Sequence, residues 1–154
     1  MSEPLEQPRF RSAALDRIHR PDFTDVQIVA LPAGADPDPR VWADRILGPG
    51  GSPAWVVALM GLRQALVGLV GIPKGSQHAF DVDCVVGQEA LIDTDDRHLR
   101  FCCGVAVDSE RSLLRVTTVV RLKGWRGRLY FAPVAVLHGP IVRAMMRRAV
   151  QMAR

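Results

Sequence analysis

The stretch DTDDRHLRF, residues 93–101, combines three aspartates with arginine and histidine. A histidine changes its charge near neutral pH, and a nearby carboxylate can orient it for proton transfer. In one interpretation, His98 is a general acid/base at a cavity mouth, tuned by Asp96 or Asp93. In the other, the stretch is a hairpin turn: the aspartates bond their own backbone, Arg97 is solvated, and His98 begins a strand. The sequence leaves both interpretations open.

Three further side chains are candidates for proton transfer or ligand binding. His138 lies on the apolar stripe of a predicted helix, as a core histidine or as a group lining a cavity. Tyr130, the single tyrosine, is an amphipathic anchor or a donor to a ligand oxygen. Glu89 alternates with apolar residues, so its side chain is expected to point inward. An inward carboxylate needs a partner or a raised pKa, and an ion pair with Arg115 or Arg121 is the plainer interpretation.

The residues that hold metals and cofactors do not form a recognisable pattern. His98 and His138 are forty residues apart, with no chelating pair one helical turn apart, so no metal site is predicted. The glycines of GPGGSP lack the lysine and hydroxyl of a phosphate loop, so no cofactor is predicted. The three cysteines, Cys84, Cys102 and Cys103, include no C-x-x-C pair. We interpret them as reduced, buried thiols of a cytoplasmic protein.

Length and charge indicate one folded domain with a polarised chain. The 154 residues suit an irregular N-terminal arm over 1–20 and a single domain over 21–154. Residues 1–110 contain ten Lys/Arg and all sixteen Asp/Glu, whereas residues 111–154 contain ten Lys/Arg and no acid. This basic segment either attracts an anionic partner or packs beside the acidic segment, which we favour. Nucleic acid is not expected, since no aromatic residues interleave with the basic ones.

Local patterns predict the order of elements. Residues 22–32 are typical of a strand, and Asp38 followed by Pro39 is typical of a helix start, so a helix is expected over 39–47. Period two over residues 80–122 predicts at least three antiparallel strands, each with one apolar face. Alternation in the first strand is carried by Phe23, Val26, Ile28 and Ala30.

The C-terminal segment returns to a helical period. Pro133 suits its first turn, and Pro140 either kinks the helix or begins its main part. Arg143, Arg147 and Arg154 lie mostly off the apolar stripe. The expected stripe consists of Val134, Leu137, Ile141, Met145 and Met152, with His138 beside them.

A second helix, over residues 54–72, is as long as a membrane span. Arg63 at its middle costs about 2.5–3.5 kcal/mol on insertion scales, and three glycines weaken the span further. We therefore expect a largely buried helix and no stable span, with peripheral membrane contact as a lesser alternative.

The predicted order is a strand, two helices, a set of antiparallel strands and a long C-terminal helix. Such a helix buries its apolar face by lying across the sheet, which predicts an α+β fold. The order also resembles domain-of-unknown-function family 2867 and, through it, the START-like (SRPBCC) helix-grip superfamily. That resemblance implies a curved antiparallel sheet wrapped around the helix, with a cavity for apolar or amphipathic ligands. It is carried by DFTDVQIVAL, SPAWVVALMGLRQALVGLVGI, DTDDRHLRF, VTTVVRL and GRLYFAPVAVLHGPIVRAMMRRA.

Three functions fit these observations. The first is binding of a small apolar or amphipathic molecule between the sheet and the C-terminal helix. The second is a cofactor-independent cyclase or isomerase of a polyketide-like substrate in the same cavity. The third is a non-catalytic protein-interaction module that docks through residues 54–72 or the basic end, with a dimer left open. In the enzyme, protons would be moved by His98, His138, Tyr130, Glu89 and Asp96.

Overall fold

The computed structural model describes residues 11–58, 61 and 80–154. These residues form an α+β fold with a five-stranded antiparallel sheet of order β1-β5-β4-β3-β2. The strands are β1 (Phe23–Ala30), β2 (Cys84–Val86), β3 (Glu89–Asp95), β4 (Leu99–Asp108) and β5 (Leu113–Leu122). The helices with complete bounds are α1 (Ala14–Arg17), α2 (Pro39–Leu47) and α4 (Gly124–Met152).

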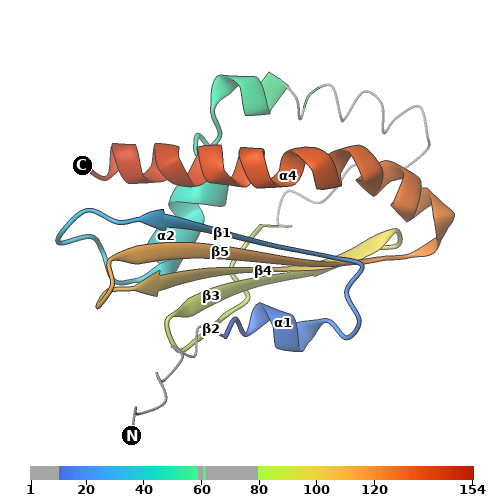
Figure 1. Ribbon diagram of the computed structural model, residues 1–154, viewed down its shortest axis with the longest axis horizontal. Helices are drawn as coiled ribbons and strands as arrows, with labels where there is room; N and C mark the ends of the chain where they lie inside the picture. The colour runs from blue at the N-terminus through green and yellow to red at the C-terminus, as the bar shows by residue number, and fades with distance from the viewer. Residues whose placement is uncertain (1–10, 59–60, 62–79) are drawn as a thin grey trace, which may run out of the picture.

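The sheet is covered on both faces. Figure 1 shows α4 lying along one face and α1 against the other. A curved antiparallel sheet with a long C-terminal helix across it is a helix-grip-like arrangement, and it confirms the predicted fold class. We call the two sides of the sheet the α4 face and the α1 face.

The α4 face holds the main core. In β4 and β5, Val105 pairs with Val116 and Val107 with Leu114, so the predicted apolar sides of the two strands coincide. Both strands present one row of apolar side chains because successive residues point to opposite faces. The helices α2 and α4 complete the core, and its largest fully buried members are Trp42, Ile46, Ile92, Leu114 and Met146.

The helix α2 has the bounds that its sequence predicts. Asp38 is the N-cap residue, and its carboxylate accepts a hydrogen bond from the Arg40 backbone N–H at 2.9 Å. Pro39 occupies the first turn, where its missing N–H would be unpaired in any case. Trp42 then lies fully buried against the sheet, and its indole Nε1 donates to the Asp36 carbonyl at 2.8 Å.

The orientation of β1 differs from the predicted one. Asp25 pairs with Thr118 and Gln27 with Val116, which places both polar residues on the α4 face. Val26 and Ile28 point to the other side and are each 46% exposed. The reason is that β1 is an edge strand whose register is fixed by pairing with β5, so its more apolar side need not be the buried one.

The helix α4 begins earlier than predicted and is rotated about its axis. It starts at Gly124, which has φ of 69°, and continues through both prolines. Pro133 and Pro140 lie on the exposed side, where water can satisfy the carbonyls that their missing N–H groups leave unpaired. Leu137 and Met152 were expected on the buried stripe but are exposed. The buried residues are Gly127, Phe131, Met145, Met146, Ala149 and Val150.

The α1 face is covered by the chain that precedes β1. Ala14 and Ile18 are buried there against Leu91, Cys102 and Val119. The N-terminal arm, expected to be irregular over 1–20, therefore contains the short helix α1. Of the helix predicted over 54–72, residues 54–58 and 61 are helical, and the rest lies outside the described residues.

Candidate functional site between β1 and α4

A histidine–aspartate pair joins α4 to the edge strand β1. His138 Nδ1 lies 3.1 Å from Asp25 Oδ2, and the two side chains are 17% and 20% exposed. Phe23 packs edge-on against the imidazole, with ring centroids 5.4 Å apart. A carboxylate on Nδ1 fixes the ring orientation and favours the tautomer whose other nitrogen, Nε2, is a proton acceptor. Asp25 and Phe23 thus hold the His138 ring in one orientation.

The polar contacts continue along β1. The Gln27 amide Nε2 donates to Asp25 at 2.9 and 3.2 Å, and its Oε1 accepts from Arg143 Nε at 3.0 Å. Gly139 lies opposite, where a Cβ atom would stand 3.1 Å from the Gln27 amide. The glycine thus lets α4 approach the strand closely enough for these contacts. One connected set of polar contacts therefore joins His138, Asp25, Gln27 and Arg143, and we call it the β1–α4 network.

An open depression of about 390 Å³ lies at the Arg143 end of the network. Arg143 and Arg147 are one helical turn apart and both line it, so two guanidinium groups border the same space. Within the described part of the chain, neither arginine is paired with a carboxylate. The depression is therefore suited to an anionic group. Its lining consists of Gln27, Gly139, Pro140, Arg143, Ala144 and Arg147.

The stretch DTDDRHLRF forms the hairpin between β3 and β4, in agreement with the turn interpretation. The Asp96 carboxylate accepts from the Arg97 backbone N–H at 2.6 Å, and the Asp96 N–H donates to the Leu99 carbonyl at 2.8 Å. The His98 carbonyl accepts from the Lys123 N–H at 2.8 Å. His98 itself lies in the turn rather than in β4. Its backbone thus fixes the start of α4.

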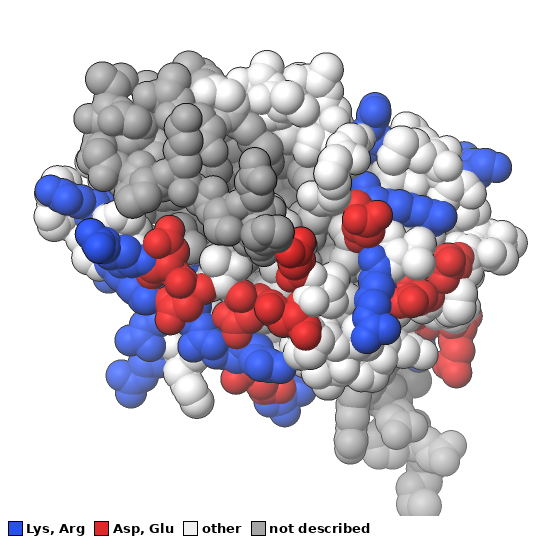
Figure 2. All heavy atoms as spheres, turned by 180° about the vertical axis from the view of Figure 1, so that it is seen from behind, with Lys and Arg blue, Asp and Glu red and all other residues white. Residues whose placement is uncertain are grey.

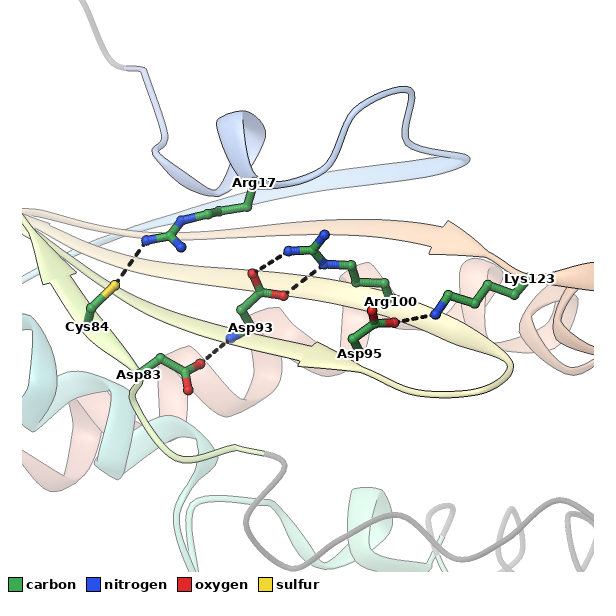
Figure 3. A network of polar contacts seen from close by, with 7 residues as sticks. All are labelled: Arg17, Asp83, Cys84, Asp93, Asp95, Arg100 and Lys123. Atoms are coloured by element: carbon green, nitrogen blue, oxygen red, sulfur yellow. Dashed lines mark hydrogen bonds and ion pairs between the residues drawn. The ribbon is translucent and has the colours of Figure 1, made fainter.

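The remaining acids of this stretch are paired on the α1 face (Figure 3). Asp93 accepts from Arg100 Nε at 3.2 Å and from Arg100 Nη2 at 2.9 Å, and Asp95 pairs with Lys123. The hydrogen bond and charge of Asp93 raise the pKa of the Arg100 guanidinium. Both carboxylates thus have structural partners.

Glu89 lies in a buried ion pair on the α1 face. Its carboxylate is 3.2 Å from Arg115 Nη2, and the Glu89 and Arg115 side chains are 6% and 5% exposed. Ser12 Oγ donates to the same carboxylate at 2.5 Å and the Ala13 N–H at 2.7 Å. The inward orientation and the pairing with Arg115 agree with the prediction. Because its oxygens already accept from three donors, we interpret Glu89 as a structural residue that attaches the N-terminal segment to the sheet. We call this role the latch.

The predicted proton-transfer residues are therefore not gathered at one place. Glu89 and Asp25 point to opposite faces, since Glu89 is in register with Ala106 and Arg115 whereas Asp25 is in register with Thr118. Tyr130 lies in the second turn of α4 and is half-buried. Of the five predicted residues, His138 belongs to the β1–α4 network.

Sequence reasoning missed Asp25, Gln27, Arg143 and Arg147 as members of this site. One signal was present: the alternation of β1 shifts at Thr24–Asp25, which leaves the apolar side of the strand ambiguous. If the polar side of β1 faces inward, Asp25 and Gln27, which are two residues apart, lie next to each other on that face. Which side faces α4 depends on the pairing with β5, and no local pattern carries that information.

The cysteines have the character of buried structural residues. Burial raises the pKa of the Cys102 and Cys103 thiols to about 12. Cys84 is half-exposed, and its sulfur accepts a hydrogen bond from Arg17 at 3.2 Å. In the described part of the chain, no three His, Cys, Asp or Glu side chains gather as metal ligands.

Thiol labelling is expected to separate these cysteines. In native protein near pH 8, iodoacetamide should alkylate Cys84 at least tenfold faster than Cys102 or Cys103, because only the thiolate reacts. Peptide mass mapping over time gives the three rates, and labelling in denaturant provides the control. Rapid alkylation of Cys102 in native protein would contradict its burial under α1.

Acidic and basic side chains are close together over part of the surface. Figure 2 shows them side by side on the face opposite to the view of Figure 1. Arg111 pairs with Asp108, Arg115 with Glu89 and Lys123 with Asp95, so the start of the basic segment is neutralised as predicted. The second half of α4 has no such carboxylate partners among the described residues.

Comparison with known proteins identifies a family but no activity. Residues 17–145 match the model of a family described as protein of unknown function, DUF2867. No curated protein and no solved structure matches the chain. The family match covers both partners of the β1–α4 pair, Asp25 and His138.

Proposed function

We propose that this protein, which belongs to the DUF2867 family, binds a small amphipathic molecule carrying an acidic group. The observation that carries the proposal is the pair Arg143 and Arg147 beside one depression, without a carboxylate partner among the described residues. A guanidinium group binds carboxylates and phosphates through two parallel hydrogen bonds. Two such groups one turn apart would hold the acidic end of the ligand.

The β1–α4 network would make this site rigid. Gln27 uses its amide nitrogen on Asp25 and its oxygen on Arg143, so the position of the Arg143 guanidinium is tied to the His138–Asp25 pair. A binding group whose rotamer is fixed before the ligand arrives loses less conformational entropy on binding. The histidine in this proposal is a positioning residue.

A second candidate function is proton transfer at the same place. The observation in its favour is the 3.1 Å contact that orients His138. An oriented imidazole would act as general acid/base on a bound molecule, as in a cofactor-independent isomerase or cyclase. The same proposal includes membership of the START-like (SRPBCC) superfamily. The cavity of that superfamily, which accepts apolar ligands, would provide space for the apolar part of the ligand or substrate.

The proposal is tested by comparing two adjacent arginines. Native mass spectrometry of the purified protein identifies any bound compound, and titration with dodecanoate and dodecanol provides a defined probe. We expect dodecanoate to bind at least tenfold more tightly than dodecanol. Arg147→Gln should weaken dodecanoate binding roughly tenfold. Arg148→Gln removes the same charge from a residue outside the depression and should leave the affinity unchanged.

The results also distinguish the two candidate functions. Equal binding of the acid and the alcohol, or equal effects of the two arginine variants, would contradict an anion site between Arg143 and Arg147. If a compound is found, His138→Gln should retain most of its binding in the carrier, because the glutamine amide can still donate to Asp25 and so help to hold Gln27 and Arg143 in place. In the enzyme, the same variant would bind the compound but lose its conversion, which chromatography of the incubated mixture would reveal.

A further inference from the structure

The helix α4 exposes large apolar side chains on the side that faces away from the sheet. Trp125, Leu129 and Val136 are 68%, 61% and 76% exposed. With Ala132 and Pro133 between them, they recur every three or four residues and so lie along one side of the helix. We call these five residues the apolar ridge. A contiguous apolar surface of this kind is typical of an interaction site, whereas singly exposed apolar residues need no explanation.

The charged residues of α4 itself are all basic. The helix α4 contains no acidic residue. Arg126, Arg148 and Arg154, at the start and end of the C-terminal segment, contact no carboxylate in the described residues. Arg126 lies over the Trp125 ring, with its guanidinium carbon 5.4 Å from the ring centroid. Arginine beside exposed tryptophan and leucine is the composition of helices that lie in the interface of an anionic membrane.

The contacts on the other side of α4 determine how it would meet a membrane. Among the described helices, α4 is the one long and apolar enough to cross a bilayer by length and composition. Its opposite side, however, is anchored to the sheet by Met146 and Ala149 in the core and by the His138–Asp25 contact. Crossing the bilayer would break these contacts, whereas lying flat on its surface preserves them.

We propose that α4 docks the folded protein on the surface of an anionic bilayer. The apolar ridge enters the boundary between headgroups and acyl chains, with Trp125 at the headgroup level. Arg126, Arg148 and Arg154 contact the anionic headgroups. The ridge ends at Val136, before the residues of the depression at Arg143 and Arg147, so the two proposals rest on different residues.

The first test is sedimentation of the full chain with lipid vesicles. We expect binding to vesicles of equal parts phosphatidylcholine and phosphatidylglycerol, and at least tenfold weaker binding to phosphatidylcholine alone. Raising the salt from about 0.1 M to about 1 M should weaken the binding, because the Debye length falls from about 10 Å to about 3 Å. Arg126→Gln and Arg154→Gln should each lower the affinity about fivefold.

A matched pair of double variants tests which apolar surface is used. Leu129→Gln with Val136→Gln places good helix formers on the apolar ridge and should weaken binding at least tenfold. Val26→Thr with Ile28→Thr removes two apolar side chains that are exposed on the other face of the sheet, and binding should be unchanged. Urea unfolding of both variants checks that their folds are intact.

Tryptophan fluorescence locates the contact on the helix. Brominated lipids in the anionic vesicles should quench the emission of Trp125, and Trp125→Leu, which preserves an apolar side chain, should remove most of this quenching. Trp55 is also exposed and Trp42 is buried, so both serve as internal references. Quenching that persists in Trp125→Leu would show contact near Trp55 and would overturn the assignment to α4.

Other occupants of the ridge give different results. Equal binding to neutral and anionic vesicles would contradict the role of the arginines. Absence of vesicle binding would overturn the proposal in either of two cases. The protein would be monomeric, or it would form a dimer that the double variant Leu129→Gln with Val136→Gln dissociates. Since none of these readouts uses dodecanoate or Arg147, failure here leaves the proposed ligand site untouched, and the reverse holds as well.

Discussion

Replacing Glu89 with alanine is expected to lower the free energy of unfolding by about 3–5 kcal/mol. The change removes one member of a buried ion pair and takes from the Arg115 guanidinium its contact with the Glu89 carboxylate. It also removes the acceptor for Ser12 Oγ and the Ala13 N–H, so the segment that leads into α1 loses its attachment. Urea unfolding followed by circular dichroism measures the loss, and proteolysis near residue 13 reports release of the segment.

Two comparisons separate this effect from a general loss of charge. Asp95 forms an ion pair with Lys123 in which both side chains are partly exposed, so Asp95→Ala should cost at most about 1 kcal/mol. Gly104→Ala should disturb the same buried pair, because the Cβ atom of the new alanine would stand 2.1 Å from Glu89 Oε1. If Glu89→Ala and Asp95→Ala were equally mild, the latch interpretation would be wrong.

Replacing Trp42 with alanine is expected to cost about 3–5 kcal/mol, by loss of burial and by the cavity that remains. The indole is fully buried beneath α4, and the change also removes its hydrogen bond to the Asp36 carbonyl. Trp55→Ala is the matched control, because Trp55 is 51% exposed, and it should change stability by about 0.5 kcal/mol or less. Thermal and urea unfolding give both values.

The Trp42 variant also tests how the space between the sheet and the helices is filled. An apolar void of this size stays dry and accepts small aromatic molecules, so indole should raise the melting temperature of Trp42→Ala but not that of the native protein. A loss below about 1 kcal/mol, or equal stabilisation of both proteins by indole, would mean that the native interior already contains a cavity near Trp42. That outcome would favour the apolar-ligand function.

The parts of the fold that were predictable from sequence are those fixed by neighbouring residues. The start of α2 follows from Asp38 and Pro39, because a side-chain cap and a restricted φ act within one turn. The sides of β4 and β5 that face α4 follow from apolar residues at every second position. The hairpin at Asp96 follows because a short carboxylate bonds its own backbone.

What the sequence left open depends on contacts between distant segments. The side of β1 that faces α4, the rotation of α4, and the meeting of Asp25 with His138 across 113 residues are set by strand register and helix packing. Alternation in β1 is weak, so pairing with β5 decides its orientation. The helix α4 is apolar on more than one side, so its own pattern does not determine which side is buried. The packing of α4 against β1 and α2 determines which side of the helix is buried. It thereby produces both the His138 site and the exposed apolar ridge.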